Sequence, residues 1–133
     1  MKKYLLDTNI CIYLLKNLYH LNNKIEQIGI GNCFVSEITV AELKFGVENS
    51  KDIINNRKIL KDFINKFTIL PIFTSLDIYA TEKARLRKSG TPTGDFDLLI
   101  GATSIFNNLT LVTKNTSDFK RINGIVIEDW TSI

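Results

Sequence analysis

Four carboxylates in this sequence stand where acidic side chains have few structural reasons to be. Three of them lie among side chains typical of a buried core: Asp7 at the end of "KKYLLD", Glu42 within "ITVAELKFG" and Asp97 within "DFDLLIGATS". The fourth, Asp118, follows the apolar run "LTLVT" by a few residues. A carboxylate in such a place either caps a helix or forms part of an active site, because an unpaired buried charge is costly.

Convergence of these four acids would require that protons or a cation neutralise part of their charge. In open parallel sheets, ligands collect beyond the carboxyl ends of the strands, and both Asp7 and Asp118 follow apolar runs that we interpret as strands. Since adjacent strands lie about 5 Å apart, carboxylates gathered there repel one another at neutral pH unless protons or an ion neutralise them. The donors are all oxygen, and the single His20 has no histidine or cysteine at ligand spacing. The pattern therefore favours Mg²⁺ or Mn²⁺ over zinc.

The chemistry favoured by such a site is metal-assisted hydrolysis of a phosphodiester bond. A bound divalent ion lowers the pKa of a coordinated water and neutralises charge on the leaving oxygen, so no nucleophilic side chain is required. The sequence agrees, because it contains no nucleophile elbow, no Ser-His pairing and no glycine pattern of a P-loop.

The elements that must position these acids are predicted to alternate between strands and helices. Short apolar runs indicate strands at 4–6, 33–35, 68–72, 109–113 and 125–127. Segment 52–67 has the apolar spacing of a surface helix, Ser75 is expected to cap a helix over 76–88, and Asp95 to cap one over 95–106. The predicted fold class is α/β, a three-layer α/β/α sandwich around a mostly parallel central sheet, with residues 1–133 as a single domain.

Composition limits the class of protein. A length of 133 residues fits one compact domain, and a net charge of +3 suits a phosphate-bearing partner without requiring one. Cys11 and Cys33 lie in apolar surroundings without metal-ligand spacing, which favours buried free thiols in a reducing compartment. The start "MKKYLL" lacks the apolar region of a signal peptide, and no run is long enough to span a membrane. We expect a cytoplasmic protein with no membrane contact.

Each acid also has a structural alternative. Asp7 is as well placed to cap a helix beginning near Ile10 as to serve an active site, and Asp118 fits a solvated loop equally well. Glu42 has the poorest structural explanation. Asp95 has the better capping position before its helix, which leaves Asp97 as the candidate ligand.

Taken in order, "LLDTNI", "ITVAELKFG", "DLLIGATS", "LTLVTKNTSDFKRI" and "IEDW" resemble the PIN-domain nucleases, above all the VapC toxins of bacterial toxin–antitoxin pairs. The resemblance covers essentially the whole chain. It implies a PIN-like fold and a Mg²⁺-dependent (or Mn²⁺-dependent) ribonuclease that cleaves RNA, with transfer RNA a frequent target in the family. Its catalytic acids are then Asp7, Glu42, Asp97 and Asp118, with Asp7 and Asp97 as metal ligands. Many PIN domains have an aspartate at the position of Asn115, so either Asn115 or Asp118 completes the cluster, or the site uses three acids.

The resemblance also implies supporting residues and partners. Thr8, Asn9, Thr39, Thr113 and Asn115 fall where the family places polar groups around the acids. Candidate RNA contacts are Lys44, Arg85, Arg87 and Lys114. Family members pair with a small VapB-like antitoxin whose tail crosses the active-site groove, commonly form homodimers, and bind promoter DNA only through the antitoxin.

Two other functions compete with the nuclease. A phosphatase or phospho-receiver domain also places aspartates at strand ends, but "DTN" lacks the second aspartate of a D-x-D pattern and the third strand ends in "PIFTS" without an acid. A non-catalytic PIN-like binding module would keep the acids only as caps and ion pairs. The presence of Asp7, Glu42 and Asp97 together argues against such degeneration.

Overall fold

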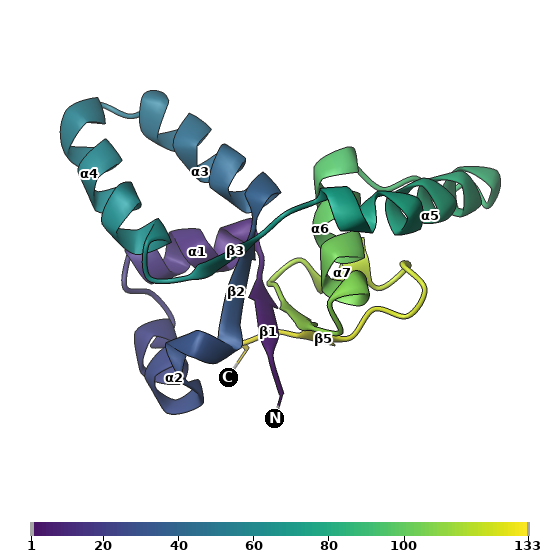
Figure 1. Ribbon diagram of the computed structural model, residues 1–133, viewed down its shortest axis with the longest axis horizontal. Helices are drawn as coiled ribbons and strands as arrows, with labels where there is room; N and C mark the ends of the chain where they lie inside the picture. Colours follow the sequence, from purple (N-terminus) through teal and green to yellow (C-terminus); the bar gives the residue numbers. More distant parts are fainter. Residues whose placement is uncertain (1, 133) are drawn as a thin grey trace.

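The computed structural model describes residues 2–132, and at its centre is a five-stranded sheet whose neighbouring strands are all parallel (Figure 1). The strand order is β3-β2-β1-β4-β5. The bounds are β1 Tyr4–Leu6, β2 Cys33–Ser36, β3 Thr68–Leu70, β4 Thr110–Val112 and β5 Ile127–Glu128. All five predicted strands are present with small differences at their ends. The third ends at Leu70 rather than residue 72, because Pro71 has no N–H to donate to a neighbouring strand.

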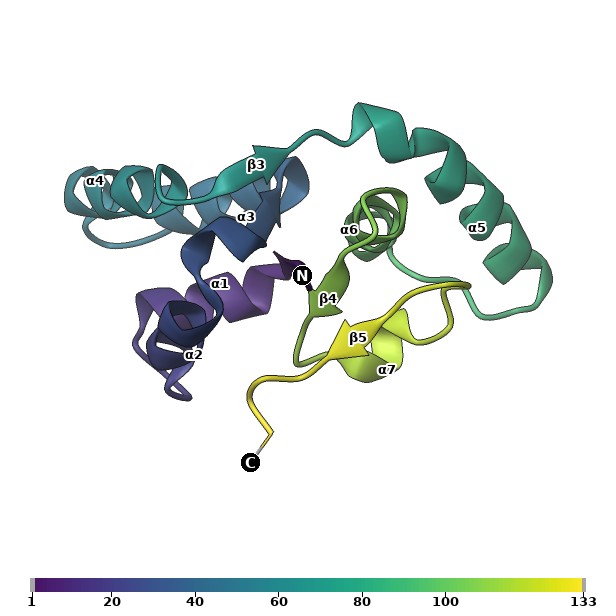
Figure 2. The same ribbon diagram turned by 60° about the horizontal axis from the view of Figure 1, so that its bottom comes forward.

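Helices cover both faces of this sheet, so the predicted three-layer α/β/α sandwich is confirmed (Figure 2). One face packs against α1 Thr8–Leu15, α2 Leu21–Ile28, α3 Glu37–Glu48 and α4 Ile53–Ile64. The other packs against α5 Leu76–Lys88, α6 Asp95–Phe106 and α7 Thr116–Phe119. Two short 3-10 turns, η1 Ile30–Asn32 and η2 Phe73–Ser75, complete the described elements. Within residues 2–132, no helix has the length and apolar character needed to cross a membrane.

The first strand shows why the apolar runs are continuous rather than alternating. Tyr4 and Leu6 point into the layer of α1–α4, while Leu5 points into the layer of α5–α7, because successive side chains of a strand face opposite sides. Both layers are apolar, so every residue of β1 is buried. This is the expected pattern for a parallel sheet covered on both faces.

The strand order reverses at β1, which lies between β2 and β4. The chain leaves β1 toward β2 and β3 and then returns across the sheet to β4 and β5. The Asp7 N–H donates to the Val112 carbonyl at 2.9 Å, so the carboxyl ends of β1 and β4 are joined. Connections diverging from two adjacent strands leave a crevice at these ends, where ligands of such sheets bind.

One predicted helix cap lacks its hydrogen bond and a second is wrong. Ser75 occupies the N-cap position of α5 as predicted, but its backbone (φ −99°, ψ 0°) is helical rather than extended because η2 runs directly into α5, and its buried hydroxyl has no hydrogen-bond partner. Asp95 is the first residue of α6, whose N-cap is Gly94. The Asp95 carboxylate instead accepts hydrogen bonds from Tyr79 and Lys83 of α5 at 2.8 and 2.7 Å. The segment predicted as a helix at 52–67 begins at Ile53 and ends at Ile64.

Close packing of α6 on the chain after α7 predicts an effect at Gly101. A Cβ added there would lie 2.7 Å from Cδ1 of Ile122, a residue only 2% exposed. We expect Gly101→Ala to lower the free energy of unfolding by about 1–2 kcal/mol, because overpacking outweighs the better helix propensity of alanine. Urea unfolding measures the change.

The matched control is Gly46→Ala in α3, where an added Cβ would have no atom within 4 Å. This variant should raise the free energy of unfolding by roughly 0.5–1 kcal/mol. A Gly101→Ala protein as stable as wild type would contradict the close approach of α6 and Ile122.

Candidate active site

Asp7 lies directly after β1 and is both a helix cap and a buried acid at the sheet edge. Its Oδ1 accepts from the Thr8 N–H at 2.8 Å, which caps α1, and its Oδ2 accepts from the Thr113 hydroxyl at 2.7 Å. The capped helix begins at Thr8, slightly before the predicted start near Ile10. The side chain is only 3% exposed. The two interpretations of Asp7 are therefore compatible, since capping uses one oxygen and leaves the carboxylate at the crevice.

The pKa of Asp7 is raised to about 6, and burial is the main cause. The hydrogen bonds from Thr113 and from the Thr8 N–H act in the opposite direction, and the negative charges of Asp97 and Glu42 contribute to the rise. Three acids, one directly after β1, one in α3 and one in α6, thus repel one another.

Glu42 is oriented by two threonines that belong to different elements. The Thr8 hydroxyl donates to Glu42 Oε1 at 2.7 Å, and it lies 3.0 Å from the Thr39 hydroxyl. Because a hydroxyl has one hydrogen, the Thr39 hydroxyl must donate to that of Thr8. Thr8 and Thr39 therefore hold Glu42 of α3 beside the start of α1.

Asp97 and Asp118 extend the acidic cluster toward solvent. Asp97 lies half-buried in the first turn of α6, and Asp118 lies exposed in α7. Burial raises the pKa of Asp97, and the charges of Asp118 and Glu42 raise it further. Electrostatic repulsion therefore links Asp97 to Asp118 and to the inner pair, Asp7 and Glu42, and these four residues are named the acidic group.

The donor set of this group suits a hard divalent ion. Its side chains offer carboxylate and hydroxyl oxygens, and the two contacts to Asp7 come from uncharged donors. Among residues 2–132, however, no three acidic, histidine or cysteine side chains already stand close enough together to form a metal site. A bound ion would have to draw the four carboxylates closer.

The predicted asparagines connect the two central strand ends. Asn9 Oδ1 accepts from the Lys114 N–H at 3.4 Å, and the Asn115 N–H donates to the Thr113 hydroxyl at 3.0 Å. Asn115 contributes its backbone to this network and occupies the N-cap position of α7 without a side-chain cap bond. The Asn115 backbone therefore helps to position Thr113, which holds Asp7, and Asn9 joins the first turn of α1 to Lys114, the next residue.

The lysines and arginines predicted to bind RNA lie on α3, on α5 and directly after Thr113. Lys114 is exposed one residue after Thr113, with its Nζ 3.1 Å from the Tyr19 hydroxyl and over the rings of Tyr13 and Tyr19. Arg87 is exposed on the last turn of α5. Lys44 lies two residues after Glu42, hence on another side of α3, and lines a cavity of about 540 Å³ between α3 and α4.

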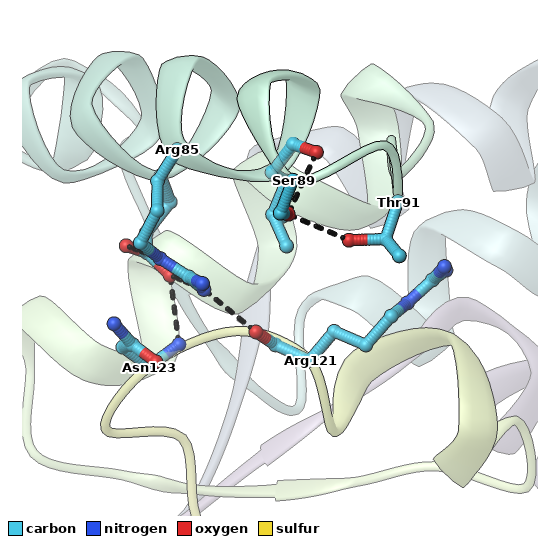
Figure 3. A network of polar contacts seen from close by, with 7 residues as sticks. Arg85, Ser89, Thr91, Arg121 and Asn123 are labelled. Carbon is cyan, nitrogen blue, oxygen red and sulfur yellow. Dashed lines mark hydrogen bonds and ion pairs between the residues drawn. The ribbon is translucent and has the colours of Figure 1, made fainter.

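Arg85 connects α5 to the segment after α7, and Figure 3 shows its contact with Arg121. Its guanidinium donates to both carboxylate oxygens of Glu82, at 3.0 and 2.8 Å, and to the Arg121 carbonyl at 2.7 Å. Glu82 Oε1 also accepts from the Asn123 N–H at 2.7 Å. These contacts give Arg85 an intramolecular role. Sequence reasoning missed Glu82, although its place four residues before Leu86 puts it on a core-facing side of α5.

Comparison with known proteins identifies the fold and its activity. Residues 4–125 match the PIN domain family model. The chain belongs to the PIN-domain family. This PIN domain is 35% identical over 132 residues to the tRNA(fMet)-specific endonuclease VapC of Salmonella typhimurium, covering 98% of this chain and 99% of the relative. It is 36% identical over 130 residues to ribonuclease VapC2 of Rickettsia felis, covering 96% and 97%.

A solved structure agrees with this assignment. The crystal structure of DNA-bound VapBC from Salmonella typhimurium superposes with a TM-score of 0.90 at 33% identity, covering 98% of this chain and 99% of that one. The α/β PIN-like fold predicted from the sequence is confirmed. The PIN domain is accordingly a VapC-type ribonuclease toxin of toxin–antitoxin systems rather than a phosphatase or receiver domain.

The raised pKa of Asp7 predicts how stability depends on pH. An unfolded aspartate titrates at about 3.9, whereas the folded PIN domain holds the pKa of Asp7 at about 6. The folded state binds the Asp7 proton more tightly than the unfolded state, so protonation of Asp7 stabilises the fold. This contribution to the free energy of unfolding is fully present below about pH 4 and is lost as the pH rises through about 6. In metal-free buffer, Asp7→Asn should therefore be more stable than wild type at pH 7 by about 1–2 kcal/mol, with the difference vanishing toward pH 4.

Urea unfolding at several pH values in the presence of a chelator measures this difference. Asp62→Asn, at an exposed position of α4, serves as the control and should follow wild type at every pH. A stability difference between Asp7→Asn and wild type that is the same at pH 4 and pH 7 would contradict a buried, titrating Asp7.

Proposed function

We propose that the acidic group at the ends of β1 and β4 binds a divalent ion, Mg²⁺ or Mn²⁺, and that RNA phosphodiester bonds are hydrolysed there. Asp7 and Asp97 are the proposed ligands, and Glu42 and Asp118 complete the catalytic acids. The observation that carries the proposal is the burial of Asp7 beside two further carboxylates, which raise its pKa, while its hydrogen-bond donors are neutral. Such a charge arrangement is stabilised by a hard cation.

The chain's own residues supply orientation and proton transfer in this proposal. When bound, a divalent ion supplies a water of lowered pKa and neutralises charge at the phosphate. Thr113 and the Thr8 N–H fix the two oxygens of Asp7, so its carboxylate has a defined direction. Glu42 Oε1 accepts from Thr8, and we assign the other oxygen of Glu42 to the proton of the attacking water.

The proposed substrate is RNA, with transfer RNA as the first class to examine. The support is the name of the Salmonella typhimurium relative, a tRNA(fMet)-specific endonuclease. Action on cellular RNA agrees with the cytoplasmic location expected from the sequence.

The nuclease proposal predicts metal-dependent cleavage that requires Asp97. Purified protein incubated with total cellular RNA should produce discrete fragments with Mg²⁺ or Mn²⁺ and none with EDTA. Asp97→Asn should lower the rate by at least about 100-fold, the scale on which one electrostatic or acid–base group acts. Sequencing of the fragment ends identifies the substrate.

The matched control is again Asp62→Asn, which removes a charge from α4 without touching the acidic group and should cleave like wild type. Equal cleavage in EDTA would contradict the metal, and equal cleavage by Asp97→Asn would contradict the ligand assignment.

We further propose Lys114 and Arg87 as phosphate contacts, with Lys114 the nearer to the acids because it follows Thr113 directly. Lys114→Ala should weaken RNA binding and reduce the slope of log affinity against log salt by about 0.7–1. Filter binding with a chelator present measures this. Lys58→Ala, on exposed α4, should leave the slope unchanged, and an unchanged slope for Lys114→Ala would remove Lys114 from the RNA contacts.

A VapB-like antitoxin and a second copy of the chain are the proposed protein partners. Support for the antitoxin comes from the similar Salmonella typhimurium structure, which is a DNA-bound VapBC complex. Exposed apolar side chains on neighbouring η2 and α6, Phe73 at 80% and Phe96 at 52%, suit a protein–protein contact. Contact with promoter DNA is proposed only through the antitoxin.

A further inference from the structure

Helix α5 makes polar contacts with α6, which carries Asp97, and with the loop that follows α7, which carries Asp118. Tyr79 and Lys83 of α5 bind Asp95, the first residue of α6 and two residues before Asp97. Glu82 and Arg85 of α5 bind the loop 121–124, which follows α7. The helix thus lies across α6 and the segment after α7 (Figures 1 and 2).

The second of these contacts is the more protected one. Glu82 is only 6% exposed, and its carboxylate accepts from the Arg85 guanidinium in a two-point arrangement. One of its oxygens also accepts from the Asn123 N–H, while Arg85 reaches the Arg121 carbonyl (Figure 3). Paired charged groups bonded to two backbone atoms hold the loop at a fixed distance from α5.

Helix α7 depends on such external contacts for its position. It has four residues, Thr116–Phe119, which is too short to be stable alone. On one side it is attached through the Asn115 N–H to Thr113. On the other, Phe119 and Ile122 are buried against α6, and the next residue is bound by Glu82. Asp118 itself is exposed, so its direction is set by the segments that flank it.

We propose that Glu82 and Arg85 are positioning residues that hold α7 so that the Asp118 carboxylate faces Asp97. The inference rests on the proposed role of Asp118 among the catalytic acids. Neither Glu82 nor Arg85 touches the reacting atoms, and both act through the loop 121–124. Loss of the contact between Arg85 and the loop 121–124 lets α7 move. The movement weakens the activation of cleavage by the metal ion more than it weakens RNA binding.

A double-mutant cycle tests this coupling. Arg85→Ala, Asp118→Asn and the double variant are compared with wild type in kcat/KM for a labelled RNA substrate and in the Mg²⁺ concentration giving half-maximal rate. We expect Arg85→Ala to lower kcat/KM by roughly 10- to 100-fold, the scale of a small displacement of a catalytic group, and to raise the Mg²⁺ requirement. The double variant should be no slower than Asp118→Asn alone, because the two changes act through one carboxylate.

Two further variants separate this role from general stability. Arg57→Ala removes an exposed arginine that forms a similar two-point pair with Glu48, far along the chain from α7. It should cleave RNA like wild type. If Arg85→Ala does not fold, Arg85→Lys takes its place in the cycle, since lysine can pair with Glu82 but lacks the planar fork that reaches Arg121.

The outcomes are distinct. Losses that multiply in the double variant, or full activity of a folded Arg85→Ala, would overturn the positioning role and leave the role of Asp118 intact. Full activity of Asp118→Asn with metal-dependent cleavage would overturn the role of Asp118 and the positioning proposal with it. Cleavage of RNA at the same rate with Mg²⁺ and with EDTA would instead overturn the proposed function.

Discussion

The joined ends of β1 and β4 are the constraint on which the acidic group depends. The Asp7 N–H binds the Val112 carbonyl, and the Thr113 hydroxyl returns the contact by donating to the Asp7 carboxylate. A buried carboxylate is tolerated there because two donors bind its oxygens, yet burial, with a smaller contribution from the neighbouring acids, keeps its pKa raised. The arrangement holds a charge that the fold alone does not neutralise.

The remaining elements bring further acids to this point from independent directions. Helix α3 carries Glu42, which the hydroxyls of Thr8 and Thr39 orient, and α6 carries Asp97 within its first turn. Partial positive charge at the start of a helix favours an acid there, so Asp97 is placed at little cost to the helix. Asp118 lies on α7, the shortest α-helix of the described residues, so its position depends on the segments that flank this helix.

The sequence predicts the strands and the acidic residues well, but it does not predict contacts between residues far apart in the chain. Apolar runs predict all five strands because a strand covered on both faces needs apolar side chains throughout. Acids among such core residues predict the acidic group, because a buried carboxylate without a partner is costly. Ser75 stands at the predicted N-cap position but makes no cap hydrogen bond, because it ends a 3-10 turn. The Asp95 carboxylate binds Tyr79 and Lys83 instead of capping α6, and both lie more than ten residues away in the chain. The contact of Arg85 with the Arg121 carbonyl, 36 positions along the chain, follows from no local sequence pattern. The extent of the domain over 1–133 stays a prediction.

Two buried free cysteines make it possible to follow opening of the fold in solution. Cys11 and Cys33 are buried, and burial raises the pKa of both thiols, that of Cys33 to about 11. Since only a thiolate reacts readily, both sulfurs are protected while the α1 layer stays closed. The Cys11 N–H donates to the Asp7 carbonyl in the first turn of α1. The rate of alkylation at Cys11 therefore reports opening of the helix that Asp7 caps, using a label that the chain already contains.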